Sequence, residues 1–221
     1  MAPLPSPSSH DHKYQGEKGL DHVSGMANLP GAYGQVVIGS AGSGKSTYCH
    51  AMRRYLEKCN RDVAIINMDP GNDRIPYECE VDVMELVSLN EVMETMGLGP
   101  NGAMIFCMEY IEVNLDWLRA KLSRLKGKYL LFDFPGQLEL FIHHDSCAKI
   151  LDTMINVWEI KLCAVNLLDS HVARTASSFI LALSLTLATM LNLALPHLNF
   201  LSKIDNLNRW NESLPHKMDT Y

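Results

Sequence analysis

One stretch of this chain constrains its fold more than any other, because an apolar run leads into a glycine-rich turn and then into a helix-compatible segment. Residues 34–47 read GQVVIGSAGSGKST, and positions 39–46 match the pattern G-x-x-x-x-G-K-[S/T]. Glycines at this spacing let successive backbone N–H groups point at one anion, and the next helix adds the positive end of its dipole. The pattern therefore predicts a phosphate-binding loop between a β-strand and an α-helix. A flexible Gly/Ser turn is the alternative interpretation, which the flanking strand and helix disfavour.

Two side chains of this loop have predicted roles at a nucleotide. Lys45 has the reach to contact β- and γ-phosphates as a point charge, and the Ser46 hydroxyl is a predicted ligand of Mg²⁺. Both roles depend on the spacing of these residues from the glycines.

The composition indicates one globular domain that does not bind nucleic acid directly. The chain has 221 residues, of which 47% are hydrophobic and 20% charged, with a formal net charge of −6. A nucleic-acid-binding domain usually carries a basic face. Six cysteines are scattered without a C-x-x-C pair, as is typical of reduced thiols in a cytosolic protein.

The N-terminal residues predict a separate segment. Residues 1–32 are rich in Pro, Ser, His and Gly with little apolar periodicity, so we expect a disordered arm. They contain no basic segment followed by an apolar run, and therefore no visible secretory signal. Residues 33–221 form the predicted nucleotide-binding domain.

Acidic residues follow two further apolar runs. Residues 62–67 are apolar enough for a strand covered on both faces, and Asp69 comes just after them. Because open α/β sheets bind ligands at the carboxyl ends of their strands, we expect Asp69 near Mg²⁺ or the attacking water. A carboxylate that only caps the loop is the structural alternative.

The run 128–137 predicts a third strand and contains the motif D-x-x-G at 133–136. It places Asp133 where it can hold Mg²⁺ through water, and it frees the Gly136 N–H for a γ-phosphate. Gln137 follows at the position of a water-orienting side chain, and Glu139 either assists that water or only begins the next helix.

Between and after these motifs, periodicity predicts the remaining elements. Helices are expected at 81–96, 103–124 and 176–195, a tight turn at 98–102, and strands at 162–169 and 197–201. The helix at 176–195 is apolar enough to raise the question of a membrane span. It contains several Ser and Thr residues and lacks flanking anchors, so we expect a helix buried against the sheet and no membrane.

The last motif, S-K-I-D at 202–205, bears on the choice of base. The Asp205 carboxylate can accept hydrogen bonds from N1–H and the 2-amino group of guanine, and adenine offers neither donor. Lys203 is placed to lay its stem over the base. The motif predicts GTP rather than ATP.

Taken together, the motifs resemble those of the GPN-loop GTPases, and most closely the second of the three eukaryotic paralogue groups. The similarity runs from about residue 34 to 205 and includes these segments: GSAGSGKSTYC (39–49), NMDPGND (67–73), IPYE (75–78), LGPNGA (98–103), MEYIEVNLDWL (108–118), DFPGQLEL (133–140) and SKID (202–205). The Gly99-Pro100-Asn101 triplet between a phosphate loop and a DxPGQ motif is specific in combination.

The resemblance implies an α/β P-loop NTPase fold, with a mostly parallel sheet flanked by helices on both faces. It also implies Mg²⁺-dependent hydrolysis of GTP to GDP within a dimer, in which Asn101 acts across the interface at the partner's nucleotide. By motif, phosphate and Mg²⁺ are bound by Gly42, Ser43, Gly44, Lys45, Ser46 and Thr47. Asp69, Asp133, Gln137 and Glu139 then surround the water and metal, with Ser46, Asp69 and Asp133 toward the metal, while Lys203 and Asp205 read guanine.

The resemblance further implies partners and a location. Sister GPN-loop GTPases are the expected dimer partners, as a homodimer or heterodimer, and RNA polymerase subunits or their assembly factors are the expected clients. We expect a cytoplasmic protein that shuttles to the nucleus. Family chains continue past the guanine motif, so the domain at 33–221 is expected to be C-terminally incomplete. A non-catalytic assembly module that binds a sister GTPase, and a P-loop kinase for a small molecule, are the alternatives.

Overall fold

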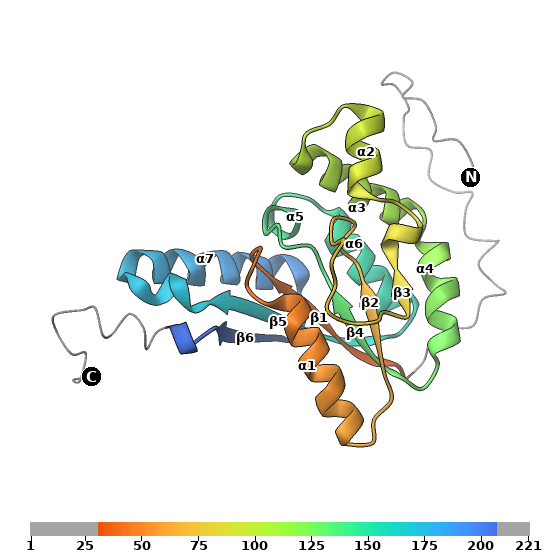
Figure 1. The fold of residues 1–221 in the computed structure, drawn as a ribbon, viewed down its shortest axis with the longest axis horizontal. Coiled ribbons are helices and arrows are strands. Elements are labelled where there is room, and N and C mark those ends of the chain that lie inside the picture. Colours follow the sequence, from red (N-terminus) through yellow and green to blue (C-terminus); the bar gives the residue numbers. More distant parts are fainter. Residues whose placement is uncertain (1–30, 207–221) are drawn as a thin grey trace.

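Six short runs form one parallel β-sheet in the computed structural model, which describes residues 31–206 (Figure 1). The order across the sheet is β3-β2-β4-β1-β5-β6. The strands are β1 (Tyr33–Gly39), β2 (Val63–Asn67), β3 (Val81–Asp82), β4 (Tyr129–Asp133), β5 (Lys161–Asp169) and β6 (His197–Ser202). The predicted arm at 1–32 lies outside the described residues except for its last two, as does the segment 207–221.

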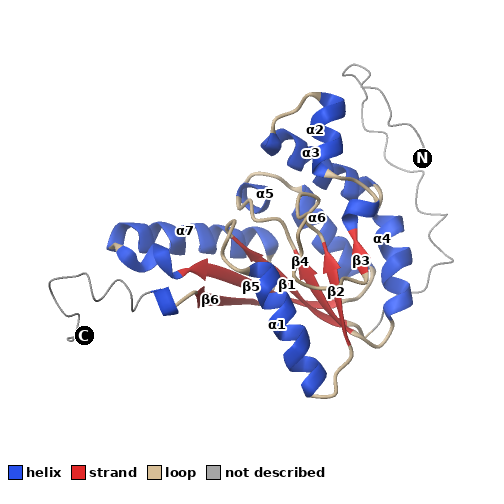
Figure 2. Ribbon diagram, in the orientation of Figure 1, coloured by secondary structure: helices blue, strands red, loops and turns tan. Residues whose placement is uncertain are grey.

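Helices cover both faces of this sheet, so the expected α/β architecture is confirmed (Figure 2). The helices are α1 (Lys45–Lys58), α2 (Leu89–Met96), α3 (Pro100–Val113), α4 (Leu115–Leu122), α5 (Glu139–Ile142), α6 (Ser146–Asp152) and α7 (Ala176–Leu193). Successive strand residues point to opposite faces. Within β1, Val37 therefore packs toward α1, whereas Val36 and Ile38 join the larger core that includes residues of α3, α4 and α6.

The single helix predicted at 81–96 is wrong at its start. Residues Val81–Asp82 pair with β2 as the edge strand β3, and a short 3₁₀ turn at Val83–Glu85 precedes α2. The Asp82 side chain accepts a hydrogen bond from the Met84 N–H at 2.9 Å. This local bond begins the turn and favours an extended backbone at Asp82 over a continuous helix.

The predicted turn at 98–102 and the helix at 103–124 also require correction. Pro100 is in the first turn of α3, a position where its missing N–H costs nothing. The helix then breaks at Asn114, whose side chain donates to the carbonyl of Tyr110 at 2.8 Å, and α4 begins one residue later. Asn101 is therefore helical rather than part of an open turn.

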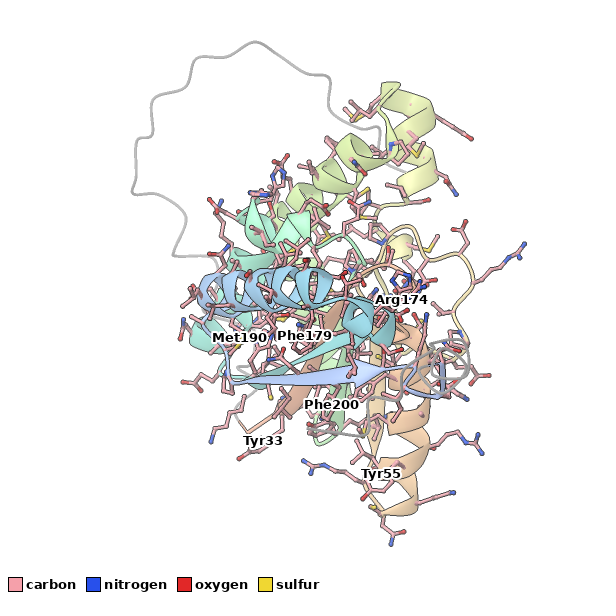
Figure 3. All side chains as sticks on the ribbon, turned by 90° about the vertical axis from the view of Figure 1, so that its left-hand side faces the viewer. Tyr33, Tyr55, Arg174, Phe179, Met190 and Phe200 are labelled. Carbon is pink, nitrogen blue, oxygen red and sulfur yellow. The ribbon has the colours of Figure 1, made fainter. Side chains whose placement is uncertain are left out.

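The sequence predicts that α7 is buried against the sheet, but most of the helix is exposed. It is long and apolar enough to cross a membrane by length and composition, with a mean hydropathy of 1.7, yet only 22% of it is buried. Its inward face is made of smaller side chains at helical spacing, including Ala182, Thr186 and Thr189, and Thr186 accepts a hydrogen bond from Asn166 of β5. Figure 3 views this side, with α7 above the edge strand β6. The large apolar side chains point outward: Phe179, Ile180, Leu181, Leu183, Leu187 and Leu191.

Because all six strands are parallel, their carboxyl ends meet at one edge of the sheet. That edge carries the loop after β1, Asp69 after β2, Asp133 at the end of β4 and the residues after β6. The topology thus brings residues from four distant parts of the chain to one place.

Candidate functional site

The loop between β1 and α1 has the backbone that the glycine pattern predicts. Gly42 and Gly44 adopt positive φ angles of 75° and 99°, and Gly44 is the N-cap of α1. At Gly39 a Cβ atom would lie 2.4 Å from the Leu167 carbonyl oxygen, so no larger residue fits. The Ser43 N–H donates to the Ser40 carbonyl at 3.1 Å and closes the turn. The N–H groups of the first turn of α1 are left without helical partners there, as an anion site requires.

Lys45 is buried at the base of this loop. Its Nζ atom donates to the Ser40 carbonyl at 3.2 Å. Burial lowers the pKa of this ammonium, and the charges of Asp133 and Asp69 oppose that shift. Three charged groups predicted from separate motifs therefore lie within electrostatic reach of one another.

Asp133 is placed by β4 so that its carboxylate faces the α1 side of the sheet. Leu131, two residues earlier on the same strand, packs in the apolar cluster beneath α1, and strand periodicity sends Asp133 the same way. Oδ2 accepts a hydrogen bond from the Tyr77 hydroxyl at 2.6 Å. Burial raises the pKa of this carboxyl, and the hydrogen bond from Tyr77, the nearby Ser46 hydroxyl and the charge of Lys45 act against the rise.

Asp69 lies two residues beyond β2 and is partly buried. Its Oδ1 atom accepts the Gly71 N–H at 2.9 Å, and its own N–H donates to the Asn67 side chain at 3.1 Å. Burial is the main cause that raises the pKa of Asp69, which the Gly71 bond and Lys45 oppose. Asp69 therefore caps its loop, the structural alternative, and also lies within electrostatic reach of Lys45. Its predicted role near Mg²⁺ or the attacking water stays a prediction.

Gly136 packs directly against the phosphate loop. A Cβ atom at this position would lie 2.8 Å from both the Ala41 Cα and the Lys45 Nζ. Gln137 follows and is half-buried, whereas Glu139 is exposed and begins α5. The structure therefore brings Gly136 to the phosphate loop and leaves Glu139 at the helix start, while their roles toward the γ-phosphate and the water stay predictions.

The segment S-K-I-D at 202–205, predicted to read the base, is bonded to the same loop. The Ser202 hydroxyl lies 2.8 Å from the Ser43 carbonyl, to which it donates. Lys203 has a positive φ of 55° and its Nζ contacts Asp169 Oδ2 at 2.8 Å, which lowers the pKa of Asp169. Asp205 is exposed just beyond. Ser202, which the motif reading left without a role, connects β6 to the phosphate loop.

Asn101, which the resemblance assigns to a partner's nucleotide, lies away from this site. It lies in the exposed first turn of α3, and residues 97–102 are exposed throughout. Figure 1 shows α2, which leads into this turn, apart from the loop between β1 and α1.

The residues present fit a magnesium ion held jointly with a nucleotide. Within residues 31–206, no group of three His, Cys, Asp or Glu side chains could hold a metal alone. Mg²⁺ commonly takes one or two carboxylates and completes its shell with water and substrate phosphates. Asp133 Oδ1 is buried and has no hydrogen-bond partner in the described part of the chain, which leaves it available as an oxygen toward such a shell.

Two residues at the site carry contacts that motif reasoning did not assign. Tyr77 donates to Asp133, and the Asn72 side chain donates to Ser46 Oγ at 3.3 Å. Both belong to the loop between β2 and β3. The adjacent residues do not predict these contacts, because Tyr77 and Asp133 are 56 positions apart in the sequence.

Comparison with known proteins places the chain among nucleotide-binding proteins. A family model described as a conserved hypothetical ATP-binding protein matches residues 37–221. The structure is similar to that of an apo GTPase from Pyrococcus abyssi, with a TM-score of 0.70, 30% sequence identity, and coverage of 82% of this chain and 71% of that one.

Curated relatives carry more specific names. A GPN-loop GTPase from Arabidopsis thaliana is 49% identical over 190 residues, which cover 86% of this chain and 63% of the relative. GPN-loop GTPase 2 from Danio rerio is 47% identical over 189 residues, covering 86% and 60%. GPN-loop GTPase 2 from Saccharomyces cerevisiae is 40% identical over 192 residues, covering 86% and 55%. The chain therefore spans 55–63% of the length of these relatives.

Proposed function

Because this chain belongs to the GPN-loop GTPase family, we propose that it binds GTP with Mg²⁺ and hydrolyses it to GDP and phosphate. The observation that carries the proposal is the convergence of Lys45, Asp133 and Gly136 at the loop between β1 and α1. A Cβ at Gly136 would touch Lys45, and Lys45 shares its buried surroundings with Asp133. These groups come from separate motifs and meet where a phosphate chain fits.

The residues of the site divide the chemical work among them. Backbone N–H groups of residues 42–47 bind the phosphates, and Lys45 leaves the Ser40 carbonyl to contact their outer oxygens. Mg²⁺, when bound, would offset the negative charge of the phosphates. Ser46, Asp69 and Asp133 would hold it and its waters. The Gly136 N–H meets the γ-phosphate, while Gln137 orients the attacking water.

We assign base recognition to Lys203 and Asp205. Two hydrogen bonds from guanine to a carboxylate are worth about 1.5–3 kcal/mol each, which amounts to a preference for GTP over ATP of about 10²–10⁴-fold. The family model's description mentions ATP, so the base preference is the first point to measure.

The proposal extends to a dimer in which each Asn101 serves the partner's nucleotide. Its support is the exposure of residues 97–102 and their separation from the phosphate loop of the same chain. The dimer partner is a second copy or a sister GPN-loop GTPase. On the family resemblance, the clients are RNA polymerase II and related complexes or their assembly factors, reached in the cytoplasm and accompanied to the nucleus.

Equilibrium titration with fluorescent GTP and ATP analogues tests the binding proposal. We expect Mg²⁺-dependent binding of GTP, a much weaker response to ATP, and loss of the difference in Asp205→Asn. Binding of neither nucleotide would contradict the proposal and favour a non-catalytic assembly module, and a preference for ATP would show that Asp205 has been misread.

Hydrolysis and the role of Asn101 are tested by mixing two inactive variants. Lys45→Ala lacks a phosphate site but keeps Asn101, and Asn101→Ala keeps the phosphate site. If Asn101 acts across the dimer, each variant alone hydrolyses GTP slowly and the mixture regains one working site per heterodimer. Gln137→Ala is expected to slow hydrolysis about 10²-fold. Its mixture with Lys45→Ala is the matched control, because neither protomer of that heterodimer has a complete site and no rescue is expected. A mixture of Lys45→Ala with Asn101→Ala that is no faster than its parts contradicts the dimer mechanism.

A further inference from the structure

The loop between β2 and β3 lies over the carboxyl edge of the sheet and contacts two of the predicted magnesium ligands. Asn72 donates to Ser46 Oγ at 3.3 Å, and the Tyr77 hydroxyl donates to Asp133 Oδ2 at 2.6 Å. Ser46 and Asp133 come from different motifs that are far apart in the chain. One loop therefore contacts a predicted metal ligand from each of the two motifs.

The Tyr77 contact is the stronger of the two. Tyr77 is 7% exposed, and its ring joins the apolar cluster formed by Val37, Leu131 and Val165 beneath α1. A buried tyrosine hydroxyl needs a partner, and a hydroxyl-to-carboxylate distance of 2.6 Å is in the range of charge-assisted bonds. The ring is fixed by packing, so the hydroxyl is held at one position.

This bond places the two carboxylate oxygens of Asp133 in different environments. Oδ2 is occupied by Tyr77, whereas Oδ1 is buried without a hydrogen-bond partner among the described residues. Rotation of the carboxylate would break the bond to Tyr77, so Oδ1 is held in place. Partners that fix a ligand's orientation in this way typically raise metal affinity about 10–100-fold.

We propose that Tyr77 is a positioning residue for the magnesium site, which orients the Asp133 carboxylate through its hydroxyl. This inference rests on the proposed function, because it assigns a role toward the Mg²⁺ that accompanies the nucleotide. The role that we assign to Tyr77 acts through Asp133 and requires no contact with the nucleotide or the metal.

The test is the Mg²⁺ concentration needed to retain fluorescent GDP, measured for the wild type and Tyr77→Phe. The phenylalanine keeps the ring in the apolar cluster and removes only the hydroxyl. We expect the half-maximal Mg²⁺ concentration to rise about 10-fold or more, while GDP affinity in EDTA stays within about twofold. Tyr48→Phe is the matched control, since it loses a half-buried hydroxyl bond to Gln35 at 3.0 Å and should leave the Mg²⁺ requirement unchanged.

Three results would overturn the inference, and they are distinguishable. An unchanged Mg²⁺ requirement in Tyr77→Phe removes the positioning role alone. Equal loss of GDP binding with and without Mg²⁺ shows that the hydroxyl only supports the fold. Wild-type binding that does not respond to Mg²⁺ overturns the proposed metal-dependent function and this inference together.

Discussion

The phosphate loop depends on positions where a side chain would collide with its neighbours. Gly39 faces the Leu167 carbonyl, and Gly136 faces Ala41 and Lys45, so the loop is closed from two sides by backbone contact. This close approach lets N–H groups reach an anion without intervening side chains. The glycines are thus structural requirements of the site as well as sources of flexibility.

Gly136→Ala is expected to weaken nucleotide binding about 10-fold or more, because overpacking typically costs about 1–3 kcal/mol and here displaces Lys45. A GDP titration in the presence of Mg²⁺ measures the loss. Gly102→Ala is the matched control, since its new methyl group meets only Leu98 side-chain atoms at 3.9 Å. Equal affinities in the two variants would show that the loop adapts to the methyl group.

The sequence was enough to predict that Lys45, Asp133 and Gly136 lie at one edge of the sheet, because each follows a strand at a fixed spacing. Their roles toward a nucleotide stay predictions. Sequence reasoning assigned no role to Tyr77 or Ser202, whose hydroxyls contact Asp133 and Ser43. Those contacts depend on which strands become neighbours in the sheet. Nothing in the adjacent residues encodes that information.

Among the elements, α7 shows the limit of inferring burial from composition. Its apolar content predicted a buried helix, but its residues at 182, 186, 189 and 193 form the inward face and its largest side chains point outward. When apolar residues lie on all sides of a helix, composition alone does not predict which side turns toward the core. The division of 103–124 into α3 and α4 was missed for a related reason, since Asn114 interrupts the helix without disturbing its apolar stripe.

Two substitutions within α7 should therefore differ strongly in their effect on the free energy of unfolding. Leu187→Gln is expected to change the free energy of unfolding by no more than about 0.5 kcal/mol, because Leu187 is 56% exposed. Leu193→Ala is expected to cost about 2–5 kcal/mol, because Leu193 is 7% exposed and packs in the larger core. Urea unfolding of both variants measures the contrast, and a large loss in Leu187→Gln would mean that the outer face of α7 is covered in solution.

Over the whole molecule, the sheet connects the first and last described segments. β1 lies between β4 and β5, and Ser202 at the end of β6 donates to the Ser43 carbonyl and, at 3.1 Å, lies near the carbonyl of Leu168. The same strand ends carry the residues to which we assign phosphate, metal and base binding. Because Ser202 at the end of β6 bonds to the phosphate loop, we expect a change there to affect both stability and ligand binding.

Ser202→Ala should lower the free energy of unfolding by about 1 kcal/mol, because it leaves a loop carbonyl without its hydrogen bond. For a chain of this size the melting temperature falls by about 2–4 °C, and GDP binding weakens in parallel. Thermal unfolding with and without GDP measures both effects. Ser177→Ala, on the exposed first turn of α7, is the control and should change neither.

The Ser202–Ser43 bond also has a consequence for synthesis of the chain. Its two residues are 159 positions apart, and the central strand is made before either of its neighbours. During synthesis, the phosphate loop cannot form its bond to Ser202 until β6 has left the ribosome. The first motif to be translated is therefore among the last to reach its final structure. Long-range pairing of this kind folds slowly and leaves apolar strands open meanwhile, which is the interval when chaperones are most useful to it.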